Sequence, residues 1–273
     1  MPSWLSNLGN SFSGRFQRTG DPTDIAGAIS AHKRAVQLTP NDHADMPSWL
    51  SNLGNSFAGR FQRTGDLTDI ANGISVHRKA VELTPDGHAD MPSRFNNLGT
   101  SFSCRFERTG DLTDIVGAIS AHQRAVQLTP NGHAAMPSRF NNLGNSFWHR
   151  FQHTGNLSDT CLAISNYRQS ATYKSGPPSV RLAAAQRWAQ LSVSYNQTDS
   201  LQAYDVVVSL LSQVAGMERT IQQRHSSLVD ISKLTATAAS AAFSQGKLGK
   251  AGSNKVAALS GANSISFGLQ WMI

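Results

Sequence analysis

The chain has 273 residues, a formal net charge of +7 and an isoelectric point near 9.8. Its basic residues are dispersed among Asp and Glu and form no Lys- or Arg-rich block, so a nucleic-acid-binding patch is not expected. No run of about 18 apolar residues is present, which argues against a membrane-spanning helix. Basic-surface binding of nucleic acid stays open only as a third reading, behind the two functions given below.

Cysteine usage points to the compartment. Cys104 and Cys161 form neither a Cys-x-x-Cys pair nor a zinc pattern nor a disulfide framework. This usage favours a reducing, intracellular setting. The first residues lack the basic and apolar regions of a signal peptide. We therefore expect a cytoplasmic protein.

A twelve-residue stretch recurs along the chain at a fixed interval. Met1–Phe12 returns as Met46–Phe57, Met91–Phe102 and Met136–Phe147, and the four starts are 45 residues apart. A fixed period of 20 to 50 residues is typical of stacked supersecondary units. The chain is therefore expected to be a repeat array.

Repeat one predicts two helices. The first begins at Pro2 and carries apolar residues on one face, at Leu5, Leu8, Phe12 and Phe16. Thr19-Gly20-Asp21 breaks it, with Gly20 as a left-handed stop and Asp21 as the next N-cap. Asp24 stands where a capping box places an acid. The second helix ends at Thr39-Pro40 and carries one packing face, formed by Ile25, Ala28, Ile29, His32, Ala35 and Val36.

The later repeats follow the same pattern until about residue 174. Beyond Pro178 only helical periodicity remains, which predicts helices over Val180–Ser194, Asp199–Ala215 and Arg219–Ser244. The expected organisation is four repeats over 1–174 (1–45, 46–90, 91–135 and 136–174), a degenerate repeat or capping helices over 175–248, and a disordered or frame-shifted tail over 249–273.

The repeat resembles the tetratricopeptide repeat (TPR). The residues that carry this resemblance are Leu8, Gly9, Phe12, Ala28, Ala35 and Pro40. The usual period is 34, and insertions between Phe12 and Ala28 and after Pro40 account for the longer unit. The resemblance implies an all-α, right-handed, tetratricopeptide-like superhelix of 45-residue helix-turn-helix units. It also implies a concave face, lined by the first helices, that binds a peptide or protein segment.

The consensus Asn-Leu-Gly-Asn-Ser-Phe, Arg-Thr-Gly-Asp-Leu-x-Asp-Ile and Leu-Thr-Pro-x-Gly-His resembles more narrowly the fungal, basidiomycete-type TPR–CHAT proteins. In that family a caspase-like cysteine peptidase domain with a His–Cys dyad follows the repeats. No residue here matches that dyad. The tail after Leu248 departs from the family's sequence. It resembles the family's coding sequence translated in a shifted reading frame, so a frame change near residue 249 is expected. Met1 occupies the repeat position of Met46, so the array could begin upstream.

Several residues that could take part in metal binding or catalysis stand at positions with a structural role. His32, His77 and His122 fall at packing positions, whereas a metal site requires ligands within about one turn. Asp21 and Asp24 are expected as helix caps rather than an acid–base pair, and both cysteines as packing thiols. A second histidine set, whose role is left open, lies in loops at His43, His88 and His133. No catalytic residue, metal site or cofactor is predicted.

The candidate site is the outward side of the first helices, which includes Ser6 and Ser13. Its predicted groove residues are Asn7, Asn10, Asn52, Asn55, Asn96, Asn97, Asn141 and Asn145. Predicted contacts to an acidic ligand are Arg15, Arg18, Arg60, Arg63, Arg105 and Arg108, although helix C-terminal charge effects explain them equally well. The expected function is a non-enzymatic scaffold. The alternative is a truncated sensor arm of a CHAT peptidase.

Overall fold

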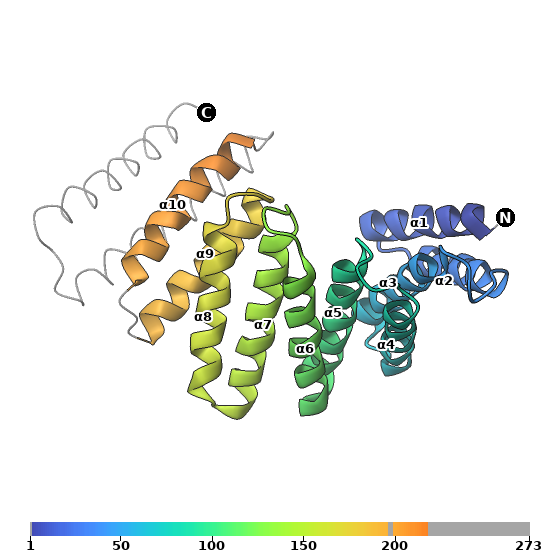
Figure 1. The fold of residues 1–273 in the computed structure, drawn as a ribbon, viewed down its shortest axis with the longest axis horizontal. Helices are drawn as coiled ribbons and strands as arrows, with labels where there is room; N and C mark the ends of the chain where they lie inside the picture. The colour runs from blue at the N-terminus through green and yellow to red at the C-terminus, as the bar shows by residue number, and fades with distance from the viewer. Residues whose placement is uncertain (1, 196–198, 218–273) are drawn as a thin grey trace, which may run out of the picture. The chain divides into compact units, whose positions relative to one another are not determined.

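The structure, a computed structural model, describes residues 2–195 and 199–217 (Figure 1). Within these residues every regular element is a helix, and none of the helices is long and apolar enough to cross a membrane. The expected helix over Arg219–Ser244 and the tail from Gly249 lie outside the described residues. The helices are α1 (Pro2–Thr19), α2 (Pro22–Gln37), α3 (Met46–Thr64), α4 (Leu67–Glu82), α5 (Met91–Thr109), α6 (Leu112–Leu128), α7 (Met136–Thr154), α8 (Leu157–Thr172), α9 (Pro178–Ser194) and α10 (Ser200–Met217).

These helices belong to two compact units. The first unit contains the residues up to Asn131 together with Asn145–Asp159. The second contains Gly132–Gly144 together with the described residues from Thr160 onward. The long helices α7 and α8 therefore each contribute to both units.

The repeats of the first unit are helix pairs, as the sequence predicts. α1 packs on α2, α3 on α4 and α5 on α6 (Figure 1). The turn within each pair follows from its residues. Gly20 adopts φ 71° and its N–H donates to Phe16 O at 2.7 Å, while Asp21 Oδ1 accepts from Thr23 N at 2.9 Å. The predicted left-handed stop and N-cap are both confirmed, and they recur at Gly65 and Asp66.

The second helix of each repeat also packs against the first helix of the next, α2 on α3 and α4 on α5. Between α2 and α3, Ile25, Ala28 and Ile29 form a buried cluster with Leu53 and Phe57. Side chains as small as alanine let the two backbones approach closely while the aromatic ring fills the remaining space. Helices inside the array, such as α3 and α4, therefore pack against both the preceding and the following helix.

Glycine in the Leu-Gly pair is required by a close approach. A Cβ built on Gly54 would overlap the ring of His77, and one built on Gly9 would overlap His32. At Gly99 the same atom would lie 2.6 Å from the His122 ring. The glycine on the first helix of each of these repeats therefore leaves room for the histidine ring of the second helix.

His32, His77 and His122 are buried, which confirms the predicted packing role. In His77, Nε2 donates to the Ser51 carbonyl at 3.3 Å, which leaves Nδ1 to accept from Ser101 Oγ at 2.9 Å in the next repeat. Burial lowers the pKa of His77 and of His122 to about 4. Both imidazoles are therefore neutral at neutral pH.

The second unit is built around α9 and α10, which pack on each other. The helix expected over Val180–Ser194 begins two residues earlier, at Pro178, and the next runs from Ser200 to Met217. Trp188 is fully buried in α9, and its Nε1 donates to Asp199 Oδ2 at 3.0 Å. Ser192 Oγ donates to the other carboxylate oxygen at 3.1 Å. Asp199 therefore ties the end of α9 to the start of α10.

The two thiols differ. Cys104 is half-buried beside the cluster that includes Phe61 and Ile74, and burial raises its thiol pKa. Cys161 is exposed, so the packing role predicted for it is wrong. It lies on the solvent-facing side of α8, and this is the side of an amphipathic helix that carries polar residues.

Candidate functional site

The predicted groove residues of the first unit lie on first helices that are neighbours. α1 contacts α3, and α3 contacts α5. The structure therefore brings amide side chains from three successive repeats onto adjacent helices. Asn7, Asn10 and Asn55 are exposed, whereas Asn52, Asn96 and Asn97 are half-buried.

The side of α1 that faces α3 is polar. Asn52 Nδ2 donates to Ser6 Oγ at 3.2 Å, and Ser13 Oγ lies 3.3 Å from Ser56 Oγ. Ser6 is only 4% exposed, so its predicted outward position is wrong. The reason is that the neighbouring first helix, which periodicity within one repeat does not reveal, covers it. Asn10 keeps an exposed amide, with Oδ1 3.2 Å from His32 Nε2.

The last two predicted amides lie on α7 but in different units. Asn145 belongs to the first unit and repeats the position of Asn10 and Asn55, although it is half-buried. Asn141 belongs to the second unit and is also half-buried. The structure therefore brings together amides of α1, α3 and α5 as one candidate surface.

Three of the predicted ligand arginines are engaged inside the molecule. Each forms an ion pair with the aspartate nine residues later, on the second helix of its own repeat, and a fourth pair follows in repeat four. Hydrogen bonding to the carboxylate raises the pKa of each of these arginines. The pairs are Arg15–Asp24, Arg60–Asp69, Arg105–Asp114 and Arg150–Asp159.

The aspartates of these pairs are buried. Asp69 is 2% exposed, and Arg60 reaches it with Nε and Nη2 at 2.7 and 2.5 Å. Asp24 is likewise buried and bound by Arg15. The predicted capping role of Asp24 is therefore wrong, while Asp21 three residues earlier is the cap. The recurring Arg and Asp at a separation of nine was a signal in the sequence that could have revealed these pairs.

The remaining predicted arginines lie at helix ends. A Cβ on Gly20 would lie 3.5 Å from Arg63 Nη2, and one on Gly65 would lie 3.4 Å from Arg108 Nη2. Each of these guanidiniums therefore sits beside the C-terminal end of the first helix of the preceding repeat, where the helix dipole favours a cation. Arg18 is exposed at the end of α1.

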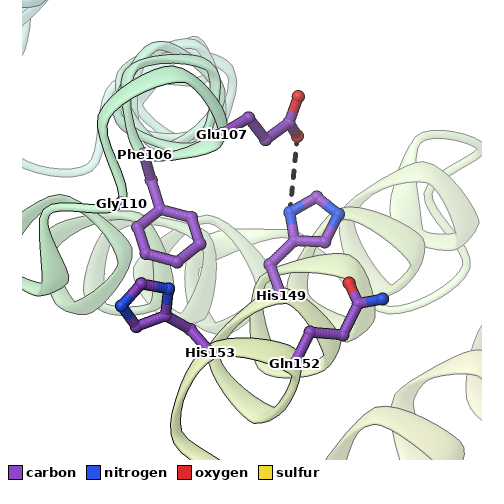
Figure 2. Close-up of a pocket in the computed structure, with 6 residues that line it drawn as sticks. All are labelled: Phe106, Glu107, Gly110, His149, Gln152 and His153. Atoms are coloured by element: carbon purple, nitrogen blue, oxygen red, sulfur yellow. Dashed lines mark ion pairs between the residues drawn. The ribbon is translucent and has the colours of Figure 1, made fainter.

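A pocket of about 300 Å³ opens where this pattern changes (Figure 2). His153 takes the place of the arginine and its ring packs edge-on against Phe106, with centroids 5.6 Å apart. His149 Nδ1 lies 3.3 Å from Glu107 Oε1. A Cβ on Gly110 would lie 3.1 Å from His153 Cε1, so the imidazole occupies the place that Arg63 and Arg108 hold beside Gly20 and Gly65. The described residues contain no group of three or more side chains that could hold a metal ion.

The loop histidines have a local structural role. His43 Nδ1 accepts from the Asp45 N–H at 3.1 Å, and the same contact recurs at His88 and His133. The His43 ring also stacks on Trp49, with centroids 5.1 Å apart. These residues therefore shape the loop that leads into the next repeat.

No protein-family model and no curated protein matches the chain. Solved structures do match. A crystal structure of "putative kinesin light chain nearly identical TPR-like repeats" of Podospora anserina aligns with a TM-score of 0.56 and 14% identity, covering 81% of this chain and 99% of that one. A thermophilic TPR protein of Thermus thermophilus aligns with a TM-score of 0.52 and 13% identity, covering 89% and 100%.

The crystal structure of MamA also aligns, with a TM-score of 0.51 and 19% identity over 74% of this chain and 95% of that one. At these identities the likeness concerns the fold. Together with the helix pairs it confirms the fold class: an all-α, TPR-like helical-repeat protein.

Proposed function

We propose that the chain is a non-enzymatic scaffold that binds an extended segment of a partner protein across α1, α3 and α5. The observation that carries this proposal is a row of exposed polar side chains. Asn10, Asn55 and Thr100 hold the same repeat position on neighbouring helices. A side-chain amide both donates and accepts hydrogen bonds, so it can pair with the N–H and C=O groups of an extended backbone.

The predicted arginine contacts support an acidic ligand less strongly than the exposed amides support an extended backbone. Arg15, Arg60 and Arg105 already hold buried carboxylates, so an acidic ligand would have to compete with those partners. Arg18, Arg63 and Arg108 are all exposed near the ends of their helices. We therefore propose that the scaffold recognises its ligand mainly through hydrogen bonds to the ligand's backbone. Secondary contacts come from the ends of the first helices, at Arg18, Arg63 and Arg108.

Selection of peptides from a random twelve-residue library on the full chain tests the proposal. The dissociation constant of a selected peptide is then compared between the wild type and the double variant Asn10→Ala/Asn55→Ala. Loss of two hydrogen bonds of about 1 kcal/mol each predicts binding that is roughly 30-fold weaker.

The matched control is Ser30→Ala/Ser75→Ala, because these serines are exposed on the second helices of the same two repeats. It is expected to bind as the wild type does. Equal affinity of the Asn10→Ala/Asn55→Ala variant and the wild type for every selected peptide would overturn the proposed surface.

The narrower resemblance to TPR–CHAT proteins, and with it the role of a peptidase sensor arm in the cytoplasm, remains a prediction. The transcript across codons 240 to 273 and beyond tests it. A one-base shift that restores the family's sequence and a downstream His–Cys domain is expected on this reading. A transcript that confirms the present tail would contradict it.

A further inference from the structure

The carboxyl ends of the first helices α1, α3 and α5 are built from equivalent residues, but the third end differs in charge. Two residues before the final threonine, α1 and α3 carry the neutral Gln17 and Gln62, whereas α5 carries Glu107. All three side chains are exposed. The carboxyl end of a helix also carries a partial negative charge on its unpaired carbonyl groups. The carboxylate of Glu107 therefore makes a helix end that is already negative more so.

The side chain that each of these ends receives from the next first helix changes as well. Arg63 Nη2 would lie 3.5 Å from a Cβ on Gly20, and Arg108 repeats this contact one repeat later. At the third end His153 takes the same place beside Gly110. A guanidinium is always charged, whereas an imidazole is charged only when it is protonated. The helix end that gains a carboxylate is thus the one that loses its guanidinium.

The arginines nearest to Glu107 in the sequence are engaged elsewhere. Arg105 and Arg150 are held by the buried carboxylates of their ion pairs, and Arg108 reaches back to the end of α3. Glu107 Oε1 lies 3.3 Å from Nδ1 of His149, on α7. The Glu107 side chain is nevertheless 56% exposed, so a ligand can reach its carboxylate while His149 positions it.

These changes converge on the pocket of about 300 Å³ lined by α5 and α7, whose residues all belong to the first unit. Figure 2 shows Glu107 and His149 at one side of this pocket and Phe106 with His153 at the other. The pocket thus combines a carboxylate, three aromatic rings and the carboxyl end of a helix. Each of these groups favours a planar cation, which pairs with carboxylates, stacks on rings and donates to carbonyl oxygens.

We propose that this pocket binds the guanidinium of an arginine side chain carried by a partner protein. The chain supplies its own precedent, because Arg63 and Arg108 place a guanidinium at the two equivalent helix ends. The proposal does not depend on the row of amides, since it concerns the ends of α5 and α7 and a side chain rather than a backbone. A basic residue in the partner would therefore mark the register in which it lies on the array.

The probe is Nα-acetyl-arginine amide, titrated into the full chain that carries ¹⁵N-labelled histidine. Saturable shifts of the His149 and His153 imidazole signals are expected in NMR spectra. The neutral isostere Nα-acetyl-citrulline amide is expected to cause none. Equal binding of the citrulline compound, or tighter binding of the corresponding lysine compound, would overturn a guanidinium site. Tighter binding of free L-arginine would assign the pocket to a small molecule and overturn the partner side chain.

Two variants that restore residues of the earlier repeats test the pocket by different means. Glu107→Gln removes the carboxylate and is expected to weaken binding about tenfold. His153→Arg supplies the guanidinium from within and is expected to abolish the His149 shifts. The control Glu82→Gln removes an exposed carboxylate from the end of α4 and is expected to bind as the wild type does. Wild-type affinity in Glu107→Gln, or in His153→Arg, would overturn the proposal.

Discussion

Arg105 Nη2 lies 2.6 Å from Asp114 Oδ1, and the two side chains are 30% and 2% exposed. The carboxylate is thus the buried member and the guanidinium is its cover. Arg105→Met keeps most of the apolar stem but leaves the buried charge unpaired. We expect it to lower the free energy of unfolding by about 3 kcal/mol, as measured by urea denaturation.

The comparison for this variant is Arg108→Met, three residues along the same helix. Arg108 is exposed and interacts with the end of α3, so its replacement is expected to cost less than about 1 kcal/mol. Equal losses in the two variants would show that Asp114 does not depend on Arg105.

Two glycines in first helices predict opposite effects of alanine. At Gly54 a methyl group would overlap His77, and the strain of overpacking, about 1 to 3 kcal/mol, exceeds the helix propensity gained. Gly14 has no atom within 4 Å of the added Cβ. Thermal unfolding is expected to show a lower midpoint for Gly54→Ala and a higher one for Gly14→Ala. A higher midpoint for both would contradict the close approach.

Buried histidines predict acid sensitivity. The pKa of His77 and of His122 is about 4 in the folded chain and about 6.5 when unfolded, so the unfolded state binds more protons below pH 6.5. Stability is therefore lost as the pH falls from about 6.5 toward 4. Between pH 7 and 5 each histidine is expected to remove about 2 kcal/mol, measured by urea denaturation at several pH values.

His77→Gln separates this effect from the titration of carboxylates. Glutamine retains hydrogen-bonding groups but binds no proton in this range. Whatever its stability at pH 7, the variant is expected to lose about 2 kcal/mol less than the wild type on going to pH 5. An unchanged pH dependence would mean that His77 is not the titrating group.

Asp199 offers a test in the second unit. Asp199→Ala removes the acceptor of both Trp188 Nε1 and Ser192 Oγ, and leaves a fully buried indole N–H without its acceptor. The expected cost is about 2 to 3 kcal/mol, with a change in tryptophan emission. The exposed Asp205 in α10 provides the control Asp205→Ala, which should leave the emission unchanged.

Local signals in the sequence predicted the helix pairs well. The apolar spacing that includes Leu8 and Phe12 and the turn chemistry of Gly20 and Asp21 act within one repeat. The period of 45 shows that they recur, so the sequence alone is enough to predict them. The histidine packing positions were predicted for the same reason. His32 follows the apolar face of its own helix.

Features that depend on neighbouring helices escaped prediction. Ser6 was expected to face outward, but α3 covers it. Asp24 was interpreted as a cap, although its partner Arg15 lies on the other helix of the hairpin. The same limit applies to the candidate site. Asn10 is exposed and Asn145 is half-buried, although their positions in the repeat are equivalent. Exposure depends on the side chains of neighbouring helices that pack around each position.

The interlocking of His77 with Ser101 has a consequence for how such chains change over generations. His32 makes the same contact with Ser56 one repeat earlier, so these two junctions between repeats are equivalent. Excision of residues 46–90 by unequal recombination would bring His32 opposite Ser101 and recreate the junction that it removed. Arrays with such equivalent junctions can gain or lose whole repeats without a compensating mutation. The number of repeats can then change with the size of the partner that the array binds.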